Sequence, residues 1–77
     1  KFYTYIIQSK QNGRYYIGFS SNLEKRIEKH NAGGTASTKP YRPWILVYYE
    51  EFETKTEALK REKKIKNMKS ITYIEKL

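Results

Sequence analysis

The side chains of this sequence that could carry chemistry fall in three short segments. Tyr5 and Tyr16 lie in two segments rich in aromatic and β-branched residues. Arg26 and His30, the one histidine of the chain, are four residues apart. Glu62 lies among lysines and arginines near the C-terminus. Cysteine is absent, which excludes thiol catalysis, disulfides and cysteine metal sites. The remaining groups can transfer protons, bind anions or hold a cation.

A β-hairpin would bring the two tyrosines to one face of a sheet. Two segments have the composition of strands: Phe2–Gln8 and Arg14–Phe19. The turn Lys10–Gly13 between them contains an Asn-Gly dipeptide, which strongly favours a hairpin. With this four-residue turn, Tyr5 is opposite Gly18 and diagonal to Tyr16. Gly18 would leave room beside Tyr5 for a ligand or another backbone. Cross-strand packing is the other interpretation of such a tyrosine pair.

The next segment predicts a helix that presents an arginine and a histidine together. Ser21–Glu24 has the form of a capping box and predicts a helix that runs to about His30 or Asn31. On this helix His30 lies on the apolar stripe and Arg26 on its flank, so both project toward the sheet. The alternative is that both residues have structural roles. His30 would interact with the dipole at the C-terminal end of the helix, and Arg26 would extend its charged end into water.

A second capping box, Thr54–Glu57, predicts a helix to about Asn67 with a carboxylate on its apolar stripe. The buried face is predicted from three apolar residues: Ala58, Leu59 and Ile65. Lys60, Arg61, Lys63 and Lys64 take the remaining positions. Glu62 lies in the middle of the apolar stripe, where a charge is costly unless it is paired or binds a cation. An ion pair with Arg26 and a metal-binding or catalytic role both satisfy this requirement.

The remaining segments complete a small α+β fold. The segment Asn31–Pro43 has no apolar periodicity and predicts a functional loop. Trp44–Tyr49 is apolar at successive positions and predicts a strand covered on both sides. Ser70–Leu77 predicts a short last helix. The expected order is ββαβα(α), a three-stranded antiparallel sheet flanked by helices, in a single domain over residues 1–77.

The charge of the chain favours a polyanionic partner. Sixteen lysines and arginines against eight acidic residues give a formal charge of +8 on 77 residues. No apolar segment is long enough to span a bilayer and no signal-peptide pattern is present, so a cytoplasmic monomer without a membrane partner is expected. Within the loop, Lys39, Tyr41 and Arg42 are suited to backbone-phosphate contact and stacking. Hydroxyls of the loop would add to these contacts: Thr35, Ser37 and Thr38.

The spacing of these residues resembles that of the GIY-YIG nuclease superfamily. The segment Tyr3-Thr4-Tyr5 is followed by Tyr16-Ile17-Gly18, by Arg26 ten residues after Tyr16, by His30 and by Glu62. The resemblance covers essentially the whole chain and is strongest to small stand-alone bacterial members of uncharacterised function.

The resemblance implies a metal-dependent endonuclease, for which DNA is favoured over RNA as the substrate. The loop offers little surface for reading sequence, so selection by structure rather than by sequence is expected. By matching positions, Tyr5 and Tyr16 would be the site tyrosines, and Arg26 would bind the phosphate. His30 would be an accessory group, and Glu62 would hold Mg²⁺, or Mn²⁺ in its place. Tyr16 would take a proton from the attacking water, assisted by Tyr5 or His30. A nucleic-acid-binding module that keeps the fold without catalysis is the alternative.

Overall fold

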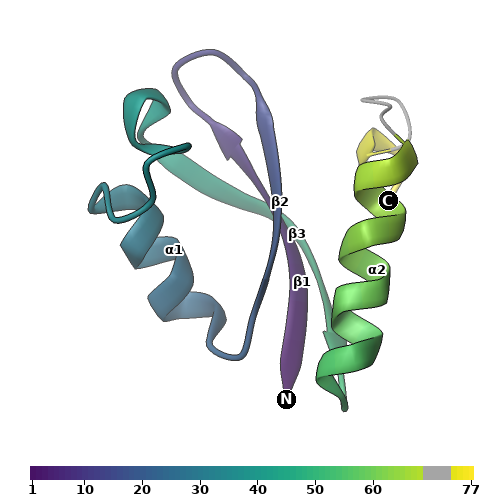
Figure 1. Cartoon of the computed structure of the whole chain (residues 1–77). Coiled ribbons are helices and arrows are strands. Elements are labelled where there is room, and N and C mark those ends of the chain that lie inside the picture. The colour runs from purple at the N-terminus through teal and green to yellow at the C-terminus, as the bar shows by residue number, and fades with distance from the viewer. Residues whose placement is uncertain (69–73) are drawn as a thin grey trace.

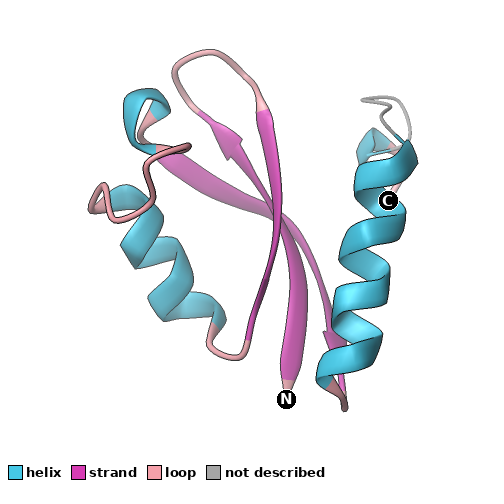
Figure 2. Ribbon diagram, in the orientation of Figure 1, coloured by secondary structure: helices cyan, strands magenta, loops and turns pink. Residues whose placement is uncertain are grey.

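The computed structural model describes residues 1–68 and 74–77 of the chain. Within them the elements run β1 (Phe2–Ser9), β2 (Tyr15–Ser20), α1 (Leu23–Asn31), the short 3₁₀ helix η1 (Lys39–Tyr41), β3 (Trp44–Phe52) and α2 (Lys55–Met68). The strands form one antiparallel sheet in the order β2-β1-β3. The two α-helices lie on opposite sides of this sheet (Figure 1), and Figure 2 shows the same layers by element type. This is the predicted α+β class and order.

β1 is the central strand and carries most of the core. Four consecutive residues of β1 are fully buried: Thr4, Tyr5, Ile6 and Ile7. Successive side chains of a strand point to opposite faces. Tyr5 and Ile7 therefore share the face of α1, where they form a cluster with Trp44. Thr4 faces α2 instead, and its hydroxyl donates a 2.6 Å hydrogen bond to the carbonyl oxygen of Ala58.

The register of the hairpin is the one predicted from the turn. Tyr5 is opposite Gly18 and Ile7 is opposite Tyr16. The turn is organised by Ser9, whose hydroxyl oxygen accepts from the backbone amides of two turn residues at 3.0 and 3.2 Å. Gly13 follows with a φ of 75°, a left-handed conformation that glycine adopts without strain. The two tyrosines are therefore diagonal neighbours on one face.

β3 corrects one expectation. The apolar run Trp44–Tyr49 predicts a strand covered on both sides, and this prediction is wrong because β3 is an edge strand and extends to Phe52. Four of its apolar side chains are 36–53 % exposed: Ile45, Leu46, Val47 and Tyr49. One helix per face is too narrow to cover three strands. The amide of Asn31 caps the outer edge at Trp44, where it accepts from the backbone N–H at 2.7 Å and donates to the carbonyl at 3.0 Å.

α1 begins one residue later than the capping box predicts. The helix cap is Asn22, whose side-chain oxygen accepts from the backbone N–H of Lys25 at 3.2 Å, so the prediction of Ser21 as the cap is wrong. Asn22 is itself fixed by Ser20, which accepts from its backbone N–H at 3.0 Å. The helix ends as expected at a glycine, because Gly33 adopts a φ of 83°.

α2 begins as predicted but presents a different face. The Thr54 hydroxyl accepts from the backbone N–H of Glu57 at 3.2 Å and donates to the Glu57 carboxylate at 3.0 Å, so Thr54 caps the helix. Ala58 and Ile65 are buried, whereas Leu59 is 40 % exposed, so its assignment to the buried face is wrong. Arg61 lies on the side of the helix that faces the sheet instead.

Arg61 and Glu50 link α2 to β3. The Arg61 guanidinium forms hydrogen bonds of 2.9–3.1 Å to the carboxylate of Glu50, which also accepts from Tyr48. The helix therefore packs through positions three and four residues apart, as expected for a single helical face. None of the helices in residues 1–68 and 74–77 is long and apolar enough to cross a membrane. The first half of the short helix predicted over Ser70–Leu77 lies outside the described residues.

Replacing Asn22 should destabilise the protein more than replacing Ser21. Asn22→Ala removes the helix cap and should lower the free energy of unfolding by about 1 kcal/mol. Ser21→Ala removes a hydroxyl with no hydrogen bond among the described residues and should change it by less than about 0.5 kcal/mol. Urea titrations of both variants measure the difference. Equal losses would contradict the observed start of the helix.

Candidate active site

Four of the five candidate residues meet on the α1 face of the sheet. The hydroxyl of Tyr5 is 2.8 Å from Nε2 of His30, and Nε of Arg26 donates to the same hydroxyl at 3.3 Å. The ring of Tyr16 lies against that of His30, with a centroid distance of 5.0 Å. The hairpin supplies the two phenols and α1 supplies the two basic groups. Tyr5 and His30 are fully buried, whereas Tyr16 and Arg26 are partly open to solvent.

A chain of hydrogen bonds assigns the protons in this cluster. The Thr38 hydroxyl donates to the carbonyl oxygen of Thr35 at 3.3 Å, so its oxygen is left to accept from Nδ1–H of His30 at 2.8 Å. Nε2 of His30 is then unprotonated and accepts from the Tyr5 hydroxyl. The Tyr5 oxygen in turn accepts from Arg26. In this arrangement Tyr5 is a neutral phenol and His30 a neutral imidazole.

The electrostatics agree with these neutral states. Burial lowers the pKa of His30 below its usual value of 6.5, and the positive charges of Arg26 and Lys29 lower it further. Burial also raises the pKa of Tyr5 above its ordinary value, and the hydrogen bond from Arg26 offsets this only in part. The positive charge beside Tyr5 is therefore insufficient to make this phenol a phenolate at neutral pH.

Gly18 gives Tyr5 the space that this arrangement needs. A Cβ atom at Gly18 would lie 2.4 Å from the Tyr5 hydroxyl oxygen and 2.5 Å from the ring carbon that bears it. The phenol thus lies directly against the backbone of the neighbouring strand. Gly18 has a structural role in the site, and no other residue type fits there without displacing Tyr5.

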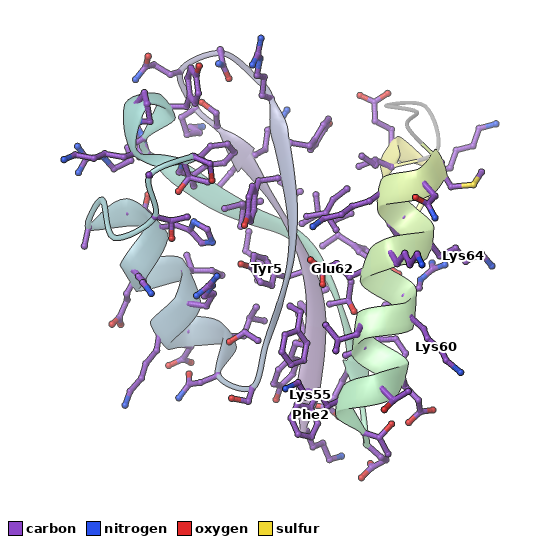
Figure 3. The ribbon with its side chains drawn as sticks, in the orientation of Figure 1. Phe2, Tyr5, Lys55, Lys60, Glu62 and Lys64 are labelled. Carbon is purple, nitrogen blue, oxygen red and sulfur yellow. The ribbon has the colours of Figure 1, made fainter. Side chains whose placement is uncertain are left out.

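Glu62 approaches from the other face of the sheet. It lies on α2 with its side chain 18 % exposed, and Figure 3 shows it directed from the helix toward the strands. Its carboxylate binds Nζ of Lys66 at 2.8 Å, and this pair replaces the ion pair with Arg26 that the sequence left open. After burial and Tyr16, the charge of Glu62 also raises the pKa of Tyr5. The carboxylate therefore lies within electrostatic range of the cluster, although it belongs to a helix on the opposite face.

Sequence comparison places this arrangement in a family. The model of the family described as the GIY-YIG catalytic domain matches residues 1–73, nearly the whole chain. The chain belongs to the GIY-YIG family. GIY-YIG domains form a nuclease superfamily, which agrees with the resemblance seen in the motif residues.

Curated relatives of this GIY-YIG chain are small bacterial proteins. A UPF0213 protein of Staphylococcus saprophyticus is 54 % identical over 67 residues, which cover 86 % of this chain and 80 % of the relative. A UPF0213 protein of Staphylococcus haemolyticus is 49 % identical over the same shares. The solution NMR structure of a UPF0213 protein from Bacillus halodurans is similar with a TM-score of 0.61 and 33 % identity. That alignment covers 97 % of this chain and 79 % of the other.

Glu62 is the candidate carboxylate for the divalent cation that GIY-YIG nucleases generally require. Among residues 1–68 and 74–77, no three His, Asp or Glu side chains gather into a complete metal site. Mg²⁺ does not need one, because it is commonly held by one or two carboxylates together with substrate phosphates and water. Lys66 is half-exposed and can leave the carboxylate when a cation arrives. Glu62 therefore fits as the protein ligand of a site completed by substrate.

The loop residues fall into two groups. Lys39, Tyr41 and Arg42 lie on or beside η1, at the end of the sheet where the hairpin turns. Thr38 does not join them at the surface, because it is 1 % exposed and binds His30. The prediction of Thr38 as a surface hydroxyl is therefore wrong. Its role could not be inferred from sequence, since a threonine in an irregular loop carries no signal of burial.

Gly18→Ala should destabilise the GIY-YIG domain by about 1–3 kcal/mol, because Tyr5 must move to admit the methyl group. Gly34→Ala is the comparison: its Cβ would meet Cγ of Lys29 at 2.7 Å and the Lys29 carbonyl oxygen at 3.2 Å, but it should cost less because the exposed Lys29 side chain can move whereas Tyr5 is fully buried. Chemical denaturation of both variants gives the comparison. Unchanged stability of Gly18→Ala would show that Tyr5 does not occupy this position.

Stability should fall as the pH drops below about 6.5. The pKa of His30 is lower in the folded chain than in the unfolded chain, so the unfolded chain binds the proton more readily. Stability is then complete above the unfolded pKa and declines below it, by up to about 1.4 kcal/mol per pH unit. Denaturant titrations between about pH 5.5 and 7.5 avoid most carboxylate titration. NMR titration of this single histidine is the second measurement, and an ordinary pKa there would contradict its burial.

Proposed function

We propose that this chain is a metal-dependent endonuclease that hydrolyses phosphodiester bonds of DNA and selects its substrate by structure rather than sequence. The observation that carries this proposal is the cluster of Tyr5, Tyr16, Arg26 and His30, with Glu62 within electrostatic range of it. Family membership supports the reaction class. The net charge of +8 supports a polyanionic substrate.

Arg26 is suited to hold the phosphate. Its Nε–H is taken by the Tyr5 hydroxyl, which fixes the guanidinium beside the two phenols. The hydrogen bond to Tyr5 is the main reason that the pKa of Arg26 is raised further, so its charge is permanent. A guanidinium fixed in this way can bind two phosphate oxygens and stabilise the charge that develops on them.

Tyr16 is better suited than Tyr5 or His30 to activate water. The Tyr5 hydroxyl donates its proton to a hydrogen bond with His30, and both ring nitrogens of the buried His30 are hydrogen-bonded. Both therefore act as positioning residues that hold Arg26 and the ring of Tyr16. Tyr16 would accept a proton from the attacking water and pass its own phenolic proton to solvent, while a new P–O bond forms and the P–O3′ bond breaks. The leaving 3′ oxygen takes its proton from solvent.

A divalent cation held by Glu62 and the substrate phosphate would supply charge stabilisation at the phosphate and at the leaving oxygen. This role explains a carboxylate near the proposed path of a polyanion, where it would otherwise repel the substrate. Mg²⁺ is the expected ion and Mn²⁺ the alternative.

Cleavage of nicked, flapped, branched and linear DNA, with Mg²⁺, with Mn²⁺ or with a chelator, tests this function. Cleavage should require the metal. It should be lost in Glu62→Gln and fall by about two orders of magnitude or more in Tyr16→Phe. DNA binding by Glu62→Gln should persist or strengthen, since a repulsive charge is removed. Because its partner Lys66 is half-exposed, this substitution should cost less than about 1 kcal/mol of stability.

Glu28→Gln is the matched control, because it makes the same chemical change at an exposed position of α1 and should leave cleavage unchanged. If Glu62→Gln loses much of its stability while its response to metal is unchanged, Glu62 has a structural role. No cleavage of any substrate by the unmodified protein would favour a nucleic-acid-binding module instead.

A further inference from the structure

The hairpin turn and the segment around η1 are joined into one surface at the end of the sheet. The side-chain amide of Gln11 donates to the carbonyl oxygens of Pro40 and Arg42 at 3.3 and 2.9 Å. The backbone N–H of Lys10 donates to the carbonyl of Pro43 at 2.9 Å. Two segments that are some thirty residues apart in sequence thus hold each other in a fixed arrangement.

Four cations lie on this surface: Lys10, Arg14, Lys39 and Arg42. The guanidinium of Arg14 lies over the ring of Tyr41, 5.7 Å from its centroid. Nε of Arg42 donates to the carbonyl of Lys39 at 2.9 Å. We call these four cations and Tyr41 the hairpin-end platform. Two of its cations are therefore held in place by contacts with the protein.

The positive charge of the platform is uncompensated. Among residues 1–68 and 74–77, none of its four cations forms an ion pair; the ion pairs involve Lys1, Arg61 and Lys66 instead. Fixed cations without a carboxylate partner attract an anion more strongly than paired ones, because no internal bond must be broken first. The platform is therefore available to a phosphate group.

Arg14 also has a defined position relative to the proposed active site. Its carbonyl oxygen accepts from the backbone N–H of Ser9 across the hairpin at 2.8 Å, and it lies just before β2, two residues ahead of Tyr16. Two residues of a strand span about 6.7 Å, a step comparable to the separation of neighbouring phosphates in a nucleic-acid strand. Tyr41, which supports Arg14, packs against the same core cluster as Tyr16.

The opposite side of the cluster is lined by carboxylates rather than by unpaired cations. A groove of about 520 Å³ lies at the other end of the α1 face, and its lining includes Tyr49 and the carboxylates of Glu24 and Glu51. Glu51 is paired with Lys1, whereas Glu24 forms no ion pair within residues 1–68 and 74–77. This side therefore lacks the unpaired cations of the platform, and a strand bound at Arg26 is attracted more strongly toward Arg14.

We propose that the hairpin-end platform binds the sugar–phosphate backbone next to the phosphate held at Arg26, on one side only, with Arg14 as the positioning residue. This rests on the proposed nuclease function and makes the substrate more specific: the strand must continue past the cleaved bond toward the platform. The bond cut is then internal to a strand, and a strand that ends at Arg26 on the platform side is a poor substrate.

DNA affinity measured over a range of salt concentrations tests the platform. In the Glu62→Gln background, Arg14→Gln should lower the log–log salt slope by about 0.7–0.9, the effect of one lost phosphate contact. Over a four-fold rise in salt, the parent should then lose about three-fold more affinity than the variant. Lys60→Gln is the control of equal charge, because Lys60 points away from the sheet on α2 (Figure 3), and it should leave the slope unchanged. Equal slopes for the parent and Arg14→Gln would overturn the proposal.

DNA in which a neutral methylphosphonate replaces one phosphate, on one side or the other of a nick, tests the direction in which the bound strand runs. Substitution on one side should weaken binding by the Glu62→Gln protein and have no effect on the double variant that also carries Arg14→Gln. Equal effects on both sides, or on neither, would overturn the one-sided platform. Tyr41→Leu removes the ring under Arg14 and should lower the salt slope, and Tyr41→Phe, which keeps the ring, should lower it less. These are binding measurements, so a protein that cuts nothing would refute the nuclease function without deciding the platform.

Discussion

The hydrogen bond between Tyr5 and His30 is the interaction on which the site depends. It joins the central strand to α1 inside the core, where an unpaired phenol or imidazole would cost 1–3 kcal/mol or so. Each partner has a second bond, from Tyr5 to Arg26 and from His30 to Thr38. Strand, helix and loop are thus held by one continuous chain of polar groups. Removing His30 would leave the buried Tyr5 hydroxyl without an acceptor, and removing Thr38 would leave Nδ1 of His30 without its partner.

The two faces of the sheet contribute different parts of the site. The α1 face supplies the phenols and the permanent cation, and α2 supplies the carboxylate from the other side. Gly18 makes room on the α1 face, because the absence of a side chain lets Tyr5 lie against β2. A cation bound at Glu62 and a phosphate bound at Arg26 would therefore meet only when substrate joins them. In the free protein this carboxylate is paired with Lys66, whose side chain is half-exposed.

Charge is distributed unequally over a chain that is strongly basic as a whole. Carboxylates gather near the end of β3, where Glu50 binds Arg61 and Glu51 binds Lys1. The cations at the hairpin end have no such partners among the described residues. The exposed apolar residues of β3 lie beside the acidic region, and Asn31 blocks the strand edge at Trp44. Across the α1 face, the distribution of charge therefore attracts a polyanion to the hairpin end more strongly than to the end of β3.

Local patterns in the sequence determined the elements, the hairpin register and the shared face of Tyr5, Tyr16 and Gly18, because turn length and strand alternation act over few residues. Other features depended on the tertiary structure. The sequence cannot show that β3 is an edge strand, that Leu59 faces water, or that Asn22 rather than Ser21 begins α1. The largest addition is in the loop: burial of Thr38 and stacking of Arg14 on Tyr41 join residues distant in sequence. Such contacts depend on how the loop packs against the finished sheet, and no periodicity within the loop encodes that packing.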